Sequence, residues 1–212
     1  MSVALDVLSI VIGYLLGSIP TAYIVSRKKK GIDIRQVGSG NMGGANVMRQ
    51  VGRREGALVG IADLAKGAAA VLVAQALNVP ELWVFGAGFA ALLGHNFPVF
   101  AGFRGGRGSA AIIGIFFVLA PKAMAVTLVL VAIPFFTTRK FMAALLIGFG
   151  LLPLFIWILE GPRPFEGSLD LVRYALLIDL FMLARNLPDL RKVVSTGVAK
   201  DIVGDGQEKK VK

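Results

Sequence analysis

The sequence contains no cysteine and has few charges for its length of 212 residues. Without cysteine there is no disulfide, no thiolate nucleophile and no cysteine-ligated metal. A single histidine, His95, argues further against a zinc site. Only 17% of the residues are charged, against about 25% in a typical soluble domain. Together with 56% hydrophobic residues and a mean hydropathy of +0.73, this scarcity of charge indicates a membrane protein.

The apolar stretches predict an all-α integral membrane protein, a bundle of seven transmembrane helices, because a spanning helix needs roughly 20 mostly apolar residues. Pro121 divides an apolar stretch that is too long for one ordinary crossing, since proline favours a helix break. We expect one transmembrane domain over 1–196 and a polar cytoplasmic tail over 197–212. The expected spans are about 3–25, 56–77, 81–97, 108–120, 122–137, 141–159 and 169–187.

Lysine and arginine gather in segments that fall on one side of the membrane if there are seven spans. These segments hold 19 of the 23 basic residues and are 26–55, 98–107, 138–140 and the C-terminal end from 185. Because cytoplasmic loops are enriched in these residues, we expect the N-terminus outside and the C-terminus in the cytoplasm. The net charge of +10 then favours membrane lipids and phosphorylated substrates as partners, and not nucleic acid.

A first glycine-rich stretch, 37–46, lies in one of these predicted cytoplasmic loops. Its glycines allow successive N–H groups to converge on phosphate oxygens, and its serine and asparagines offer side-chain hydrogen bonds. The alternative is a flexible loop, and neither common nucleotide-binding fingerprint is present. The residues of this predicted phosphate cradle are Gly38, Ser39, Gly40, Asn41, Gly43, Asn46 and Arg49.

A second glycine-rich stretch, 102–109, lies at the expected start of the fourth span. A helix N-terminus there offers free N–H groups and the positive end of the helix dipole to an anion. Arginine side chains add charge-assisted hydrogen bonds. The alternative is that the arginines simply anchor a short cytoplasmic loop. The predicted binding residues are Arg104, Gly105, Gly106, Arg107 and Gly108.

Four more residues are singled out by their positions in the expected spans. His95 is a candidate general base, or else an imidazole that hydrogen-bonds a loop or a substrate phosphate. Asp63 and Lys66 lie on one face of the second span, where charges are costly and either pair structurally or serve function. A kink at Pro20 would aim Ser18 into the site, although simple helix-end punctuation explains both residues equally well.

In this order and spacing, these motifs resemble the bacterial acyl-phosphate-dependent glycerol-3-phosphate acyltransferases, the PlsY family. The resemblance runs from about 9 to 196 and rests on 13–20, 37–43 with Asn46 and Arg49, Asp63 with 66–67, 94–100, 102–103 and 105–108. It implies a seven-span enzyme of the bacterial plasma membrane with its active site on the cytoplasmic side. The implied reaction transfers a fatty acyl group from acyl phosphate to the 1-hydroxyl of glycerol 3-phosphate, without cofactor or metal. Its products are lysophosphatidic acid and phosphate.

Acyl phosphate is a mixed anhydride and needs no covalent enzyme nucleophile. Catalysis would come from orienting two phosphorylated substrates and neutralising their charge. The resemblance implies His95, Ser39 and Asn41 as catalytic residues. The hydroxyl proton would go either to the departing phosphate or to His95.

The C-terminal motif departs from the family pattern. Arg-His-x-x-Asn in the family reads here as Arg185-Asn186-Leu187-Pro188-Asp189. We assign Asn186 and Asp189 to the phosphate site, with a neutral group and an anion where the family has histidine and asparagine. This difference leaves open a divergent relative with another acceptor, or one without turnover. The charges at Asp63, Lys66 and Asp179 leave a transporter of a phosphorylated solute as a third hypothesis.

Overall fold

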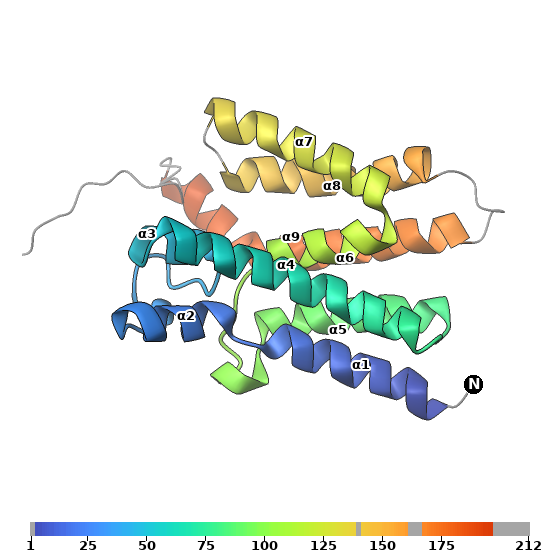
Figure 1. Cartoon of the computed structure of the whole chain (residues 1–212). Coiled ribbons are helices and arrows are strands. Elements are labelled where there is room, and N and C mark those ends of the chain that lie inside the picture. Colours follow the sequence, from blue (N-terminus) through green and yellow to red (C-terminus); the bar gives the residue numbers. More distant parts are fainter. Residues whose placement is uncertain (1–2, 139–140, 161–166, 197–212) are drawn as a thin grey trace, which may run out of the picture.

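The computed structural model describes residues 3–138, 141–160 and 167–196, and the regular structure in these ranges is entirely helical (Figure 1). Side chains are described over 3–133, 147–160 and 169–187. The predicted all-α class is confirmed for this part of the chain. The expected tail, together with Arg139 and Lys140 of one basic loop, lies outside it.

Nine α-helices and two short 3-10 helices make up the described ranges. Their bounds are α1 Val3–Ser18, α2 Thr21–Lys30, η1 Ile34–Gln36, α3 Gly44–Gln50, α4 Arg53–Ala76, α5 Glu81–Asn96, η2 Val99–Ala101, α6 Ser109–Leu119, α7 Pro121–Thr138, α8 Phe141–Leu159 and α9 Gly167–Thr196.

Three stretches of the described chain are long and apolar enough to cross a membrane, namely Val3–Lys30, Arg53–Ala76 and Glu81–Ala101. Shorter apolar helices cover Ser109–Leu119, Pro121–Ile133 and Ile147–Leu159. The predicted break at Pro121 is confirmed, because α6 ends at Leu119 and α7 begins at the proline. Seven spans remain a prediction.

The first expected span, 3–25, lies within the apolar stretch Val3–Lys30 and is divided between two helices. Helix α1 ends at Ser18, and α2 starts at Thr21 and continues to Lys30. Pro20 lacks an N–H and disfavours helical geometry at the residue before it, so the helical ladder stops at Ile19. The predicted cytoplasmic loop from 26 therefore begins as helix, and α9 likewise runs past its expected end at 187.

Small residues allow α1 and α5 to pack very closely. Gly13 and Gly17 of α1 lie against the backbone carbonyls of Ala87 and Ala91 of α5, leaving no room for a Cβ. Two small residues four positions apart on one helix face allow membrane helices to come into close backbone contact. On the other side of α5, the ring of Phe85 stacks on Tyr174 of α9 at 4.8 Å between centroids. Helix α5 thus packs against α1 on one side and against α9 on the other.

Candidate active site

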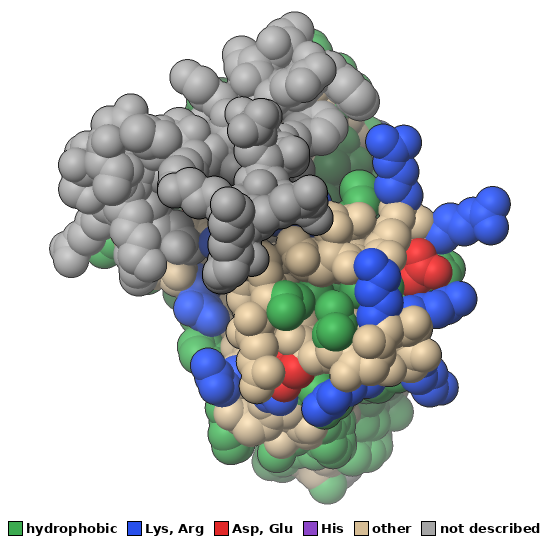
Figure 2. Space-filling model, turned by 90° about the vertical axis from the view of Figure 1, so that its left-hand side faces the viewer, with side chains coloured by type: hydrophobic (Ala, Val, Ile, Leu, Met, Phe, Trp, Pro, Cys, Tyr) green, Lys and Arg blue, Asp and Glu red, His purple; other side chains and the backbone are tan. Residues whose placement is uncertain are grey.

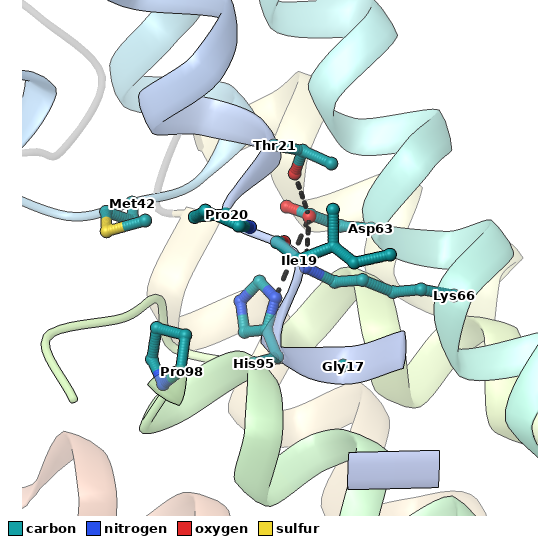
Figure 3. Close-up of a pocket in the computed structure, with 9 residues that line it drawn as sticks. All are labelled: Gly17, Ile19, Pro20, Thr21, Met42, Asp63, Lys66, His95 and Pro98. Carbon is teal, nitrogen blue, oxygen red and sulfur yellow. Dashed lines mark hydrogen bonds and ion pairs between the residues drawn. The ribbon is translucent and has the colours of Figure 1, made fainter. Parts of the chain in front are cut away.

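The junction between α1 and α2 is held by a buried ion pair from α4. Lys66 Nζ donates to the carbonyl of Ile19 at 3.0 Å and lies 2.9 Å from Asp63 Oδ1. The hydroxyl of Thr21 donates to the same carboxylate oxygen at 2.6 Å (Figure 3). Both charged side chains are less than 10% exposed. Buried charges need partners of this kind, so the pair stabilises the chain break as well as itself.

His95 reaches the same cluster from the end of α5. Its Nδ1 lies 3.7 Å from Asp63 Oδ1, beyond hydrogen-bond distance, and has no hydrogen-bond partner among the described residues. Its Nε2 is on the side of Gly106, where an added Cβ would collide with the imidazole. The imidazole therefore lies between the intramembrane carboxylate and the second glycine-rich stretch.

These residues line a small pocket at the α1–α2 junction, drawn in Figure 3. The structure thus brings together Asp63, Lys66 and His95, which come from two different helices. Thr21 belongs to the cluster but was not among the predicted site residues. Its position directly after Pro20, at the start of a helix, could have indicated it. The lining residues are Gly17, Ile19, Pro20, Thr21, Met42, Asp63, Lys66, His95 and Pro98.

The first glycine-rich stretch is folded around the side chain of Asn46. The Oδ1 atom accepts from the N–H of Ser39, and Nδ2 donates to the carbonyls of Ile34, Val37 and Asn41 at 3.1–3.2 Å. Gly38 and Gly40 supply the positive φ angles, 59° and 69°, that the turn requires. Asn46 is almost fully buried, so its amide stabilises the loop. The phosphate contact predicted for Asn46 has no support in this geometry.

The second stretch folds back on the end of α5. The N–H groups of Gly105 and Gly106 donate to the carbonyls of Asn96 and His95 at 3.2 and 3.0 Å. These two N–H groups were expected to face an anion, and here they close the base of the loop instead. Gly108, with φ 94°, caps α6 without a side-chain hydrogen bond. The start of α6 therefore remains the predicted anion-binding feature of this stretch.

The two stretches meet where Gly106 lies against the backbone carbonyl of Met42, and the guanidinium groups of Arg49 and Arg107 are near enough for their charges to interact. Although the Arg49 side chain is exposed, its partial desolvation lowers the pKa of the guanidinium, and the neighbouring positive charge of Arg107 lowers it further. A phosphate contact for Arg49 and Arg107 stays a prediction. Arg104 is exposed, and no phosphate contact is defined for it by this geometry.

Ser18 and Asn186 are both buried at the edge of the site. Ser18 packs against Gly94 of α5, and its hydroxyl has no partner in the described part of the chain. Asn186 donates from Nδ2 to the carbonyl of Met182 at 2.8 Å, and its Oδ1 is unpaired as far as the described residues extend. The side chain of Asp189 lies outside the described residues.

Arg185 is a further residue of this region that the predicted site left out. Its guanidinium lies 5.4 Å from the ring centroid of Phe97, so the end of α9 contacts the segment that follows α5. The signal was its position as the first residue of the departing C-terminal motif. The α9 motif and the segment that joins α5 to the second stretch are therefore neighbours in space.

These features define a class of protein: an integral membrane helical protein with a polar, arginine-bearing site at one end of its bundle. Figure 2, which views that end, shows Lys and Arg side chains towards its rim. The family model described as glycerol-3-phosphate acyltransferase matches residues 7–196. The chain belongs to the glycerol-3-phosphate acyltransferase family, and the resemblance seen in its motifs is confirmed.

Relatives of similar length support this assignment. The chain is 41% identical over 190 residues to glycerol-3-phosphate acyltransferase 1 of Dehalococcoides mccartyi, covering 87% of this chain and 90% of the relative. It is 38% identical over 212 residues to the glycerol-3-phosphate acyltransferase of Anaeromyxobacter dehalogenans, covering 98% of both chains.

Two crystal structures of PlsY, an integral membrane glycerol 3-phosphate acyltransferase, share the fold. The glycerol 3-phosphate form has a TM-score of 0.80 at 28% identity, and the lysophosphatidic acid form has a TM-score of 0.77 at 27% identity. Each comparison covers 90% of this chain and 92% of the other.

Proposed function

We propose that this protein transfers a fatty acyl group from acyl phosphate to the 1-hydroxyl of glycerol 3-phosphate, as a step of phospholipid biosynthesis. The hydroxyl oxygen attacks the acyl carbonyl carbon, and the bond from that carbon to the phosphate oxygen breaks. The products are lysophosphatidic acid and phosphate. Membership of the acyltransferase family and the two PlsY forms supply the substrate class.

One observation carries the assignment to this site: the first glycine-rich stretch, at Met42, and the second, at Gly106, meet beside the buried His95. The reaction handles two phosphates at once, and adjacent guanidinium groups neutralise such charge well. The start of α6 adds the positive end of a helix dipole. No cofactor enters this chemistry, because the donor is already activated.

We assign the proton-handling part of the site to His95, with Ser39 and Asn41 beside the phosphates. Asp63 lies on the Nδ1 side of the imidazole, and this leaves Nε2 directed towards the second stretch. The hydroxyl proton leaves either to Nε2 or to an oxygen of the departing phosphate. Asp63 acts on the substrate through His95 and is therefore a positioning residue.

For topology, we propose seven spans in a bacterial plasma membrane, with the N-terminus outside and the C-terminus in the cytoplasm. The uneven distribution of lysine and arginine supports this orientation. The site then faces the cytoplasm, where water-soluble glycerol 3-phosphate is supplied. The donor keeps its long tail among the helices.

The test is product formation by the purified protein. Reconstituted protein is given labelled glycerol 3-phosphate with a long-chain acyl phosphate or with the corresponding acyl-CoA. We expect labelled lysophosphatidic acid from acyl phosphate only. Absence of product with either donor, combined with failure to bind glycerol 3-phosphate, would overturn the proposal. Uptake of glycerol 3-phosphate into sealed proteoliposomes without acylation would favour a transporter instead.

A further inference from the structure

The connection between α5 and α6 exposes apolar side chains at the polar end of the molecule. Val99, Phe100 and Phe103 have exposed fractions of 41%, 61% and 59%. Loops that face water are normally polar, and an exposed apolar patch marks a surface that is covered in use. We call residues 97–103, which include η2, the aromatic loop.

The aromatic loop is held in one conformation by hydrogen bonds from neighbouring elements and by hydrogen bonds within the loop. Tyr14 Oη donates to the carbonyl of Phe97, and Arg35 Nη1 donates to the carbonyl of Ala101, both at 2.9 Å. Within the loop, the N–H of Phe103 donates to the carbonyl of Pro98 at 2.9 Å. Phe103 adopts φ 60°, which is strained for a bulky residue. The loop backbone is therefore fixed by these hydrogen bonds in a conformation that keeps the aromatic rings pointing outward.

The position of the loop along the bundle indicates what covers it. Figure 1 shows this green segment at the side of the bundle, beside the α1–α2 junction, whereas α2 and α3 reach further along the bundle axis. The far end of α2 carries the exposed cations of 27–30. Those charges mark the water side, so the loop lies nearer the hydrocarbon. Aromatic rings with a neighbouring arginine, here Arg104, are typical of the membrane–water boundary.

The two ends of the loop are both parts of the candidate active site. His95 precedes it, and the glycines at 105–108 follow it. The hydrogen bonds from Gly105 and Gly106 to Asn96 and His95 close the loop at its base. The depth of the loop in the membrane therefore fixes the depth of the site.

We propose that the aromatic loop is inserted in the lipid bilayer at the boundary between head groups and acyl chains. There it sets the site at the depth from which a long-chain donor enters out of the bilayer. The consequence for the donor rests on the proposed acyl transfer, whereas the insertion itself does not. The loop lowers the KM for long-chain acyl phosphate and leaves a short, water-soluble acyl phosphate unaffected.

The first arm of the test measures position and needs no activity. The two native tryptophans, Trp83 and Trp157, are replaced by phenylalanine, and Phe100→Trp is introduced as the reporter. In vesicles of brominated phosphatidylcholine, we expect strong quenching that is greatest with bromine near the head group. Lys28→Trp at the exposed end of α2 is the matched control and should be quenched little. Equal quenching at the two positions would overturn the proposal.

The second arm measures donor use. Phe100→Ser should raise the KM for a long-chain acyl phosphate about tenfold, as expected for loss of one buried aromatic side chain from lipid. The turnover number and the KM for a short-chain acyl phosphate should not change. Phe100→Leu, which keeps an apolar side chain, should have a KM for the long-chain donor close to that of the unmodified protein. Leu82→Ser, at the exposed opposite end of α5, is the control for a lost apolar side chain.

An equal effect of Phe100→Ser on both donors would contradict the proposed role of the loop. Failure of the unmodified protein to use any acyl phosphate would instead contradict the proposed function. In that event the quenching arm still decides whether the loop is inserted. The two failures are therefore distinguishable.

Discussion

At the scale of single residues, the site is organised by one buried carboxylate. Asp63 Oδ1 accepts a hydrogen bond from the hydroxyl of Thr21 and forms an ion pair with the ammonium of Lys66. The same oxygen faces the imidazole of His95. The sequence showed that Asp63 and Lys66 share a helical face, and it left pairing and function as equal alternatives. The structure shows the pairing. The approach of His95 was not predictable, because it depends on how α4 and α5 pack.

Removing one member of the buried pair should destabilise the protein more than removing both. Asp63→Ala leaves the Lys66 ammonium buried without its counter-ion, and breaking such a pair costs about 3–5 kcal/mol. The double change Asp63→Asn with Lys66→Met should recover much of the lost stability. Thermal unfolding in detergent measures the stability of the single and the double variant. A double variant no more stable than the single one would contradict this account of the pair.

Arg49→Ala should reduce kcat/KM for acyl transfer by about a hundredfold, as expected for loss of one charge-assisted contact to a reacting phosphate. Arg49→Lys should keep only part of the kcat/KM of the unmodified protein, because lysine lacks the planar, forked guanidinium of arginine. Steady-state kinetics checks this, with the unfolding temperature in detergent as the control for folding. Unchanged kinetics in Arg49→Ala would mean that the two stretches do not hold phosphate.

At the scale of elements, the limits of sequence interpretation lie in the loops and the helix breaks. The break at Pro121 was readable because the apolar stretch there was too long for one crossing. The break at Pro20 was readable only as one of two alternatives, a kink or a helix end, since the hydropathy continues across it and the Lys66 contact with Ile19 is tertiary. Asn46 shows the same limit. An asparagine in a glycine-rich loop suits a ligand contact and a loop scaffold equally, and only the folded loop distinguishes them.

Gly106→Ala should abolish most activity without unfolding the protein. An added Cβ would press on the His95 imidazole and displace either the ring or the loop. Gly60→Ala in α4 is the matched control, because no described atom outside its own helical turn lies within 4 Å of the added carbon. Its activity should be normal and its stability equal or slightly higher. Similar activity in the two variants would remove the link between the second stretch and His95.

At the scale of the whole molecule, composition predicted the class and the motifs predicted the family, and both are confirmed. What remains a prediction is the number of spans and their direction, because three described stretches meet the length and hydropathy of a span. Charge asymmetry is the physical basis for the proposed direction. The proposed direction would place the end that carries Lys and Arg side chains, seen in Figure 2, in the cytoplasm.

Topology can be measured directly because the chain has no native cysteine. Lys30→Cys at the end of α2 should react with a membrane-impermeant maleimide only after the cells are opened. Lys122→Cys at the start of α7 should react in intact cells. Labelling of both positions from the same side would contradict the proposed arrangement.

The central claim is the reaction itself. Mass spectrometry of a single incubation, with reconstituted protein, a long-chain acyl phosphate and glycerol 3-phosphate, tests it most directly. We expect lysophosphatidic acid and inorganic phosphate in equal amounts, with no acyl group left on the protein. An acylated protein, or phosphate released without lysophosphatidic acid, would contradict direct transfer between the two substrates.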